Sequence, residues 1–166
     1  MSTASTVEAL VAELADALSA RGEWLAVAES CTGGLIAAAC TERAGSSSWF
    51  ERGLVTYSNA AKQQLLGVPE AVLTQHGAVS EATVRAMAQG LLARSPVQHS
   101  IAVSGIAGPG GGSAEKPVGT VWVAWADAQG AEARLQVFAG DRAAVRQQAV
   151  VAALQGLCQR LSRQRA

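Results

Sequence analysis

The stretch AESCTGG, residues 28–34, places a carboxylate, two hydroxyls, a thiol and two glycines directly after an apolar run. We expect Ser30 on a turn before a helix, where its hydroxyl can face a cleft. The backbone amides of Thr32, Gly33 and Gly34 would lie at that helix N-terminus, where N–H groups stabilise an anion or a developing oxyanion. The pattern indicates either a serine nucleophile beside an anion site or an ordinary helix N-cap.

A serine nucleophile requires a base, and the chain offers two kinds. Lys62 falls in an expected short helix, where it is either a solvated surface charge or, if desolvated in a cleft, a lysine that can lose its proton near neutral pH and act as that base. The only histidines, His76 and His99, leave a Ser-His-Asp arrangement open, although no Gly-x-Ser-x-Gly elbow is present. Cys31 is a competing nucleophile, but no histidine partner lies near it in sequence.

Other polar residues are candidates for holding a ligand. Tyr57, the single tyrosine, either packs or bridges a nucleophile and its base. The serines 46–48 form a polar turn or donate hydrogen bonds to a ligand. The loop 105–117 is rich in glycine, which lets backbone amides approach a phosphate, ribose or ring, yet it lacks the order of a nucleotide triphosphatase loop. Arg142 and Arg146 lie one helical turn apart and either bind a phosphate or form a solvated helix face.

Alternating helical and strand patterns position these residues. A capping-box pattern at Ser5 and Glu8, followed by apolar residues at helical spacing, predicts a first helix over 5–20. Asp141 is expected to cap the final helix. Strands are predicted over 24–29, 53–58, 98–104, 118–127 and 133–140, and further helices over 33–43, over 59–67 and from Ser80–Glu81 onward. This order predicts an α/β fold: a three-layer α/β/α single domain with a mixed, partly parallel sheet.

Three polar stretches follow directly from predicted strands: ESCTGG, TYSNAAK and SGIAGPGGG. Sheets with parallel strands bind ligands beyond the carboxyl ends of those strands. We therefore expect the three stretches to form one site.

Composition limits the classes of function. The chain has 166 residues, 13 Lys+Arg against 13 Asp+Glu, and 49% hydrophobic residues, which fits one domain over 1–166 and disfavours nucleic acid as a partner. Three widely spread cysteines indicate neither a disulfide framework nor a zinc site. No apolar run approaches the length of a membrane span, and no leader pattern is seen, so we expect a cytoplasmic protein with no membrane partner.

Four ordered segments between Ala28 and Trp122 carry a family resemblance: AESCTGG, GSSSWFERGLVTYSNAAKQQLLGV, QHGAVSEATVRAMAQG and SGIAGPGGGSAEKPVGTVW. Together they resemble the nicotinamide-nucleotide amidases, also called the CinA C-terminal domain family. The resemblance implies hydrolysis of the carboxamide of nicotinamide mononucleotide to nicotinate mononucleotide and ammonia, a salvage step in NAD metabolism that uses no metal and no cofactor.

The resemblance also implies residue roles. Ser30 would be the nucleophile and Lys62 its base. From proximity to strand ends rather than from the resemblance, we expect Tyr57 and Thr32 to assist and further residues to hold the nucleotide. The residues expected to hold the nucleotide are Gly33, Gly34, Ser47, Ser48, Arg142 and the loop containing Gly105, Ala107 and Gly108. The partners implied are a small-molecule nucleotide substrate and a second copy of the chain, with a dimer as the expected oligomer.

Two other functions remain open at this point. A nucleotide-binding regulatory module would keep the pocket with little or no amidase activity, although the presence of both Ser30 and Lys62 argues against it. A cysteine-dependent amidase would use Cys31, in which case replacing Cys31 with alanine would abolish activity.

Overall fold

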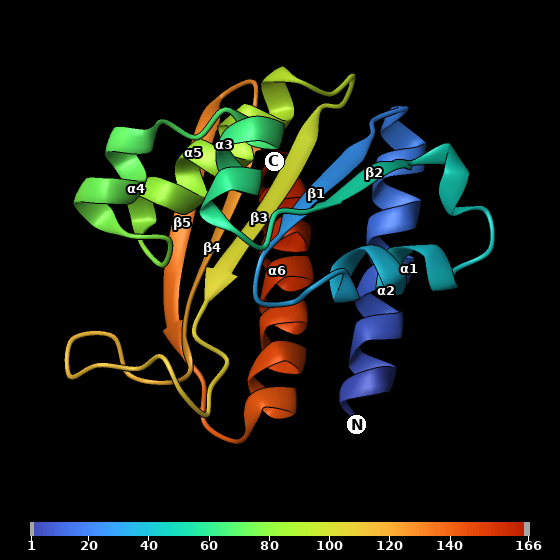
Figure 1. Ribbon diagram of the computed structural model, residues 1–166. Coiled ribbons are helices and arrows are strands. Elements are labelled where there is room, and N and C mark those ends of the chain that lie inside the picture. The colour runs from blue at the N-terminus through green and yellow to red at the C-terminus, as the bar shows by residue number, and fades with distance from the viewer. Residues whose placement is uncertain (1, 165–166) are drawn as a thin grey trace.

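The computed structural model describes residues 2–164, which form a five-stranded sheet covered by helices on both faces (Figure 1). This confirms the predicted three-layer α/β/α architecture. The elements in chain order are α1 (Thr3–Arg21), β1 (Leu25–Glu29), α2 (Leu35–Glu42), the 3-10 helix η1 (Ser46–Ser48), β2 (Phe50–Val55), α3 (Asn59–Leu66), α4 (Glu70–His76), α5 (Glu81–Ala93), β3 (His99–Gly105), β4 (Thr120–Asp127), β5 (Gly130–Val137) and α6 (Arg142–Arg163).

The sheet is mixed, with strand order β2-β1-β3-β4-β5. Strand β1 pairs in parallel with both β2 and β3, whereas β3–β4 and β4–β5 are antiparallel. The carboxyl ends of β1, β2 and β3 therefore meet at one edge of the sheet, which we call the carboxyl edge. The polar stretches after these three strands come together there, as expected.

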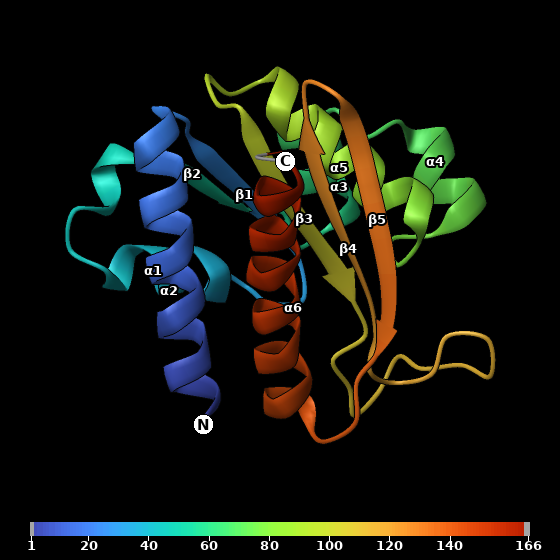
Figure 2. The same ribbon diagram turned by 180° about the vertical axis from the view of Figure 1, so that it is seen from behind.

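Alternation along the strands divides the interior into two cores. Leu25 and Val27 of β1 pack with residues of α1, α2 and α6, and Figure 2 shows α1 and α6 side by side on that face. Ala26 and Ala28 pack on the other face, with residues of α3, α4 and α5. Successive side chains of a strand point to opposite faces. Glu29, the last residue of β1, and Ser30, which follows it, are therefore directed to different helical layers.

The structure corrects three predicted boundaries. The first helix begins earlier than predicted, because Ser2 rather than Ser5 is its N-cap and accepts from the Ser5 amide at 3.2 Å. Strand β5 begins at Gly130 rather than at residue 133, so the hairpin turn is shorter than expected. Strand β2 begins at Phe50 and ends at Val55, three residues earlier at each end than predicted.

Helix α4 was not predicted. It has seven residues and follows Pro69, which occupies its N-cap position. A helix of two turns shows too few apolar residues for a clear 3.6-residue period, so the pattern between 68 and 80 did not reveal it. The cap predicted at Asp141 is correct, since its carboxylate accepts from the Ala144 amide at 2.9 Å.

Candidate active site

Ser30 and Lys62 meet at the carboxyl edge, on the side of the sheet that α3 covers. Lys62 Nζ lies 3.0 Å from Ser30 Oγ, 2.8 Å from the carbonyl oxygen of Thr56 and 3.2 Å from that of Tyr57. Lys62 is only 1% exposed, and burial lowers its pKa. Among residues 2–164, no carboxylate lies within ion-pair distance of its ammonium group. The two side chains that the resemblance pairs are therefore within hydrogen-bonding reach of each other.

Local structure explains why Lys62 reaches this position. Ser58 is the N-cap of α3 and its hydroxyl accepts from the Ala61 amide at 3.0 Å. The backbone amide of Lys62 donates to Ser58 O, so Lys62 belongs to the first full turn of the helix. Its side chain then extends toward the carbonyls that end β2, as side chains of a helix lean toward its N-terminus.

The turn after Ser30 is held by the backbone. The Ser30 amide donates to Val103 O of β3, and the Gly33 amide donates back to Ser30 O, both at 3.0 Å. Gly33 and Gly34 have φ values of 59° and 104°, in the left-handed region that glycine adopts without a steric penalty. The sequence Thr32-Gly-Gly thus allows the tight turn from β1 into α2.

The predicted set of anion-binding amides is corrected. The Gly33 amide is bonded within the turn, and the Gly34 amide donates to Glu29 Oε2 at 3.1 Å, so neither is directed at a ligand. Among residues 2–164, the amides of Cys31 and Thr32 donate to no backbone acceptor. These two amides, adjacent to the Ser30 hydroxyl in sequence, are the ones available for an oxyanion.

Glu29 is a site residue that the sequence analysis missed. It is 1% exposed and its carboxylate accepts from the Thr32 hydroxyl at 2.6 Å as well as from amides of α2. The Thr32 hydroxyl is therefore bonded away from the Ser30–Lys62 pair. Strand alternation after the buried run 25–28 is the signal that could have revealed it, since it directs Glu29 into the core under α2.

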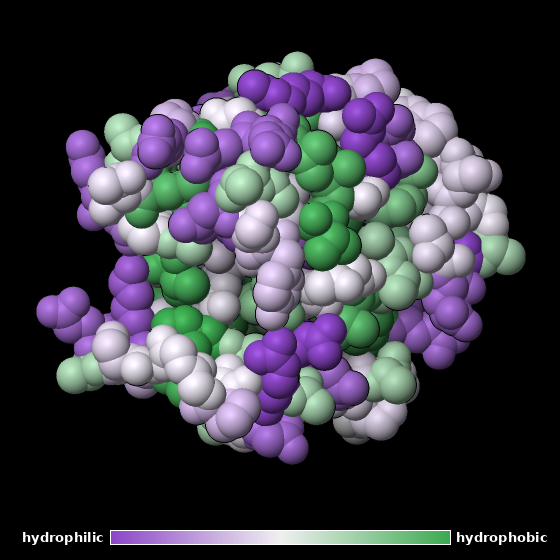
Figure 3. All heavy atoms as spheres, in the orientation of Figure 1, coloured by the Kyte–Doolittle hydropathy of each residue, from purple (hydrophilic) through white to green (hydrophobic). Residues whose placement is uncertain are grey.

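Tyr57, Arg142 and Gly108 form a second cluster near the carboxyl edge. The Arg142 guanidinium donates to Gly108 O at 2.9 Å and to the Tyr57 hydroxyl at 3.2 Å. The Tyr57 side chain is thus bonded to Arg142 and not to Ser30 or Lys62; only its carbonyl contacts Lys62. Tyr57 is 60% exposed. Figure 3 shows hydrophobic and hydrophilic side chains interspersed on the face of the molecule that Figure 1 presents.

The start of the glycine-rich loop is closely packed. A side chain at Gly105 would lie 2.7 Å from the Val121 side chain and 2.9 Å from Thr120 O, so this position requires glycine. Ala107 is buried in the core. Neither can offer a side chain to a ligand, and Gly108 contributes its carbonyl to Arg142.

Ser47 and Ser48 do not join the other predicted residues. They lie in η1, before the start of β2. Ser30 follows the carboxyl end of β1, and Lys62 lies in α3, which follows the carboxyl end of β2. The six residues of β2 separate the two ends by roughly 20 Å at about 3.3 Å per residue. We therefore do not place Ser47 and Ser48 in the site formed by their own chain.

The competing catalytic groups are less favourably arranged. Cys31 is buried, and its burial raises the pKa of its thiol to about 11, which disfavours the reactive thiolate at neutral pH. His99 begins β3, at the end of the sheet opposite Ser30, and its Nε2 lies 2.7 Å from Glu23. His76 ends α4, and its carbonyl accepts from Lys116.

Arg146 stabilises the Ser30 turn from α6. Its guanidinium donates to the carbonyls of Cys31 at 3.0 Å and Thr32 at 3.2 Å. Sequence spacing suggested a phosphate ligand for this arginine, together with Arg142. The structure instead directs Arg146 at the backbone of the turn.

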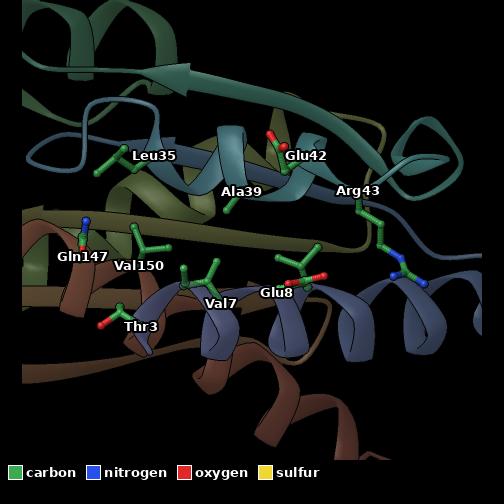
Figure 4. Close-up of a pocket in the computed structure, with 11 residues that line it drawn as sticks. Thr3, Val7, Glu8, Leu35, Ala39, Glu42, Arg43, Gln147 and Val150 are labelled. Atoms are coloured by element: carbon green, nitrogen blue, oxygen red, sulfur yellow. The ribbon is translucent and has the colours of Figure 1, made fainter. Parts of the chain in front are cut away.

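A cavity of about 570 Å³ lies elsewhere, between α1, α2 and α6 (Figure 4). Val7 of α1, Leu35 and Ala39 of α2 and Val150 of α6 line its apolar part. Neither Ser30 nor Lys62 lines it, so its size does not make it the centre of the chemistry.

Two further properties concern the described residues as a whole. No group of three or more His, Cys, Asp or Glu side chains within 2–164 is arranged to hold a metal ion. None of the helices in this range is long and apolar enough to cross a membrane.

Comparison with known proteins identifies the family. The family model described as the CinA C-terminal domain matches residues 7–161. Nicotinamide-nucleotide amidohydrolase PncC of Escherichia coli K12 is 54% identical over 158 residues, which cover 95% of this chain and 96% of the relative. The enzyme of the same name from Enterobacter agglomerans is 58% identical over 147 residues, 88% of this chain and 90% of the relative. A crystal structure from Klebsiella pneumoniae, called the competence damage-inducible protein A, superimposes with a TM-score of 0.91 at 45% identity and covers 94% of this chain and 97% of that one. This chain belongs to the CinA C-terminal domain family.

Proposed function

We propose that this chain hydrolyses the carboxamide of nicotinamide mononucleotide, giving nicotinate mononucleotide and ammonia, and that Ser30 and Lys62 carry the reaction. The substrate is the one in the names of relatives that match nearly the whole chain. The observation that carries the mechanism is the 3.0 Å separation between Lys62 Nζ and Ser30 Oγ. Proton transfer requires hydrogen-bond reach of this kind.

Lys62 is arranged to act as the base. A neutral lysine has two N–H donors and one lone pair, and the carbonyls of Thr56 and Tyr57 can accept both N–H bonds. The lone pair is then directed at the third neighbour, the Ser30 hydroxyl. Burial lowers the pKa of Lys62, which increases the fraction of the neutral form at a given pH.

The reaction proceeds through an acyl-serine intermediate. Ser30 Oγ bonds to the carboxamide carbon while its proton passes to Lys62. The amides of Cys31 and Thr32 stabilise the oxyanion that forms. Lys62 then donates the proton to the nitrogen, the C–N bond breaks and ammonia leaves. Water attacks the acyl-serine with Lys62 accepting its proton, and that proton returns to Ser30 as nicotinate mononucleotide is released.

The cluster beside the dyad is suited to holding the nucleotide. Arg142 donates from two guanidinium nitrogens to the Tyr57 hydroxyl and Gly108 O, which fixes it between two loops of the carboxyl edge. A guanidinium in this position is a donor for a phosphate or a ribose hydroxyl. Arg142, Tyr57 and the loop at Gly108 are accordingly assigned to substrate binding.

The dimer that the resemblance implies and the cytoplasmic location that the sequence predicts are part of the same proposal. All three cysteines carry free, buried thiols, which suits a reducing compartment. Light scattering on the purified chain measures the oligomeric state, and a mass of one protomer at assay concentration would refute the dimer.

The test is ammonia release from nicotinamide mononucleotide by the purified chain in the presence of a chelator. Turnover that survives the chelator, with nicotinate mononucleotide formed in equal amount, is the expected result. A folded chain that binds the nucleotide without releasing ammonia would replace the proposal with a nucleotide-binding module.

A further inference from the structure

Glu29 is a buried carboxylate without a cationic partner. It is 1% exposed, and among residues 2–164 it forms no ion pair. Four hydrogen bonds compensate instead: Oε2 accepts from the Thr32 hydroxyl at 2.6 Å and from the amides of Gly34 and Ile36 at 3.1 Å, and Oε1 accepts from the Ala37 amide at 2.8 Å. Burying a charge is costly unless it is fully hydrogen-bonded, so these four bonds are a specific arrangement.

These bonds take the place of an ordinary helix cap. Gly34 is the N-cap residue of α2 and has no side chain with which to cap it. Glu29, on the neighbouring strand, satisfies amides that the first turn of a helix leaves unpaired. One side chain of β1 thus fastens the start of α2 to the sheet.

The residues between Glu29 and α2 are those that surround the nucleophile. Glu29 is bonded to Thr32 and Gly34, while Ser30 is bonded through its amide to Val103 O. The turn is therefore fixed on both sides, and Ser30 Oγ extends from the opposite face of the strand toward Lys62.

The same turn orients the two free amides. In a trans peptide the N–H and the C=O point in opposite directions. The carbonyl of Cys31 accepts from Arg146, so the Thr32 N–H in the same peptide points away from α6. The carbonyl of Ser30 accepts from Gly33, so the Cys31 N–H in the same peptide points away from the Gly33 amide. The direction of both donors depends on a turn that Glu29 holds in place.

From this geometry we infer that Glu29 is the positioning residue of the site: its carboxylate holds the turn 30–34 so that the Cys31 and Thr32 amides face the oxyanion. It does not contact the substrate. The inference rests on the proposed function, because the oxyanion belongs to that reaction. The contacts of Glu29 do not depend on it. A carboxylate is required because every contact is with a donor, and glutamine would place its own N–H₂ against the Ala37 amide.

The test is Glu29→Gln, compared with Asp127→Asn at the other end of the sheet. Asp127 is a matched control, since it is 7% exposed and accepts from Gln129, Arg160 and Gln164 at 2.7–2.8 Å. We expect Glu29→Gln to lower kcat about 100-fold, the cost of misplacing an oxyanion donor, with KM changed less than about threefold. Asp127→Asn should lose a similar amount of thermal stability and leave kcat within about twofold. Equal kcat in the two folded variants would overturn the inference.

A second readout separates this inference from the proposed substrate. Labelling of Ser30 by a fluorophosphonate, followed by mass spectrometry, reports the reactivity of the serine without nicotinamide mononucleotide. Slower labelling in Glu29→Gln supports the positioning role even if the wild type hydrolyses no nucleotide. Equal labelling rates in wild type and variant contradict it, and a Ser30 that the reagent never labels refutes both proposals.

A further pair of variants covers the case in which Glu29→Gln does not fold. Thr32→Val removes the hydroxyl that Glu29 accepts from, whereas Thr32→Ser keeps it. The inference predicts a lower kcat for Thr32→Val than for Thr32→Ser, with similar KM values. Identical kcat values for the two variants would contradict it.

Discussion

The two ends of the sheet differ in whether their buried ionisable side chains form ion pairs. At the carboxyl edge, Glu29 and Lys62 are both 1% exposed, and within residues 2–164 neither forms an ion pair. At the other end, where β4 finishes, Asp127 pairs with Arg160 at 2.7 Å, and Arg160 also pairs with Glu132 at 2.9 Å. Unpaired buried charge is costly, and its concentration at one end is typical of a site where chemistry takes place.

The consequences for ionisation differ accordingly. Burial alone would raise the pKa of Asp127, but hydrogen bonds from Arg160, the Gln129 amide and Gln164 outweigh it and lower that pKa. At Lys62 no carboxylate offsets burial, and the pKa is lowered. The paired end keeps its charges at neutral pH, whereas the carboxyl edge is arranged to move a proton.

Removing the lysine at the carboxyl edge should have the largest effect. We expect Lys62→Met to lower kcat by about 10³-fold, within the range that general-base catalysis contributes. Lys116, the other lysine of the chain, is the matched control, since its Nζ only donates to His76 O. Lys116→Met should retain kcat within about threefold, and equal losses in the two variants would remove the distinction drawn for Lys62.

The pH dependence of kcat/KM should report the lowered pKa of Lys62. Only neutral Lys62 accepts a proton, so kcat/KM should rise with pH and level off above its pKa. Because burial lowers that pKa, the midpoint should lie below the ordinary lysine value of about 10.4. A profile that falls as pH rises through this range would exclude a lysine base.

A substitution at the paired end should change the free energy of unfolding and not kcat, and it is the smallest effect that we predict. Asp127→Asn should lower the free energy of unfolding by about 2 kcal/mol, because hydrogen bonds to a charged group are lost. The lowered pKa means that this stabilisation is present above the unfolded-state value of about 3.9 and is lost as pH falls through the folded value. Urea unfolding at pH 7 and pH 3 measures it, and a wild type–variant difference that grows in acid would contradict the assignment.

The sequence predicted the elements that position the dyad better than it predicted the details of the site. Ser30 and Lys62 each follow a predicted strand, so topology predicted that their stretches meet at the carboxyl edge, whereas their pairing was implied by the family resemblance and their 3.0 Å contact is seen only in the structure. The order of motifs says nothing about which end of a strand they occupy, and for this reason Ser47 and Ser48 were grouped with a site about one strand length away.

Strand alternation could have placed Glu29 under α2, but its hydrogen-bond partners and the set of free amides lay beyond sequence reasoning for a different reason. Their roles depend on contacts between a strand and the following helix, which residue types alone do not specify. Gly34 belongs to a Thr-Gly-Gly turn of the type that binds anions, but its amide already donates to the Glu29 carboxylate. Which amides remain free becomes evident only after every buried donor has been assigned an acceptor.

The most direct test of the account compares two adjacent residues, Ser30→Ala and Cys31→Ala, by ammonia release from nicotinamide mononucleotide. Both side chains are buried at the same turn, and circular dichroism verifies that each variant folds. The account predicts a loss of at least about 10³-fold for Ser30→Ala and a change of less than about threefold for Cys31→Ala. Turnover that survives Ser30→Ala but is abolished by Cys31→Ala would contradict it.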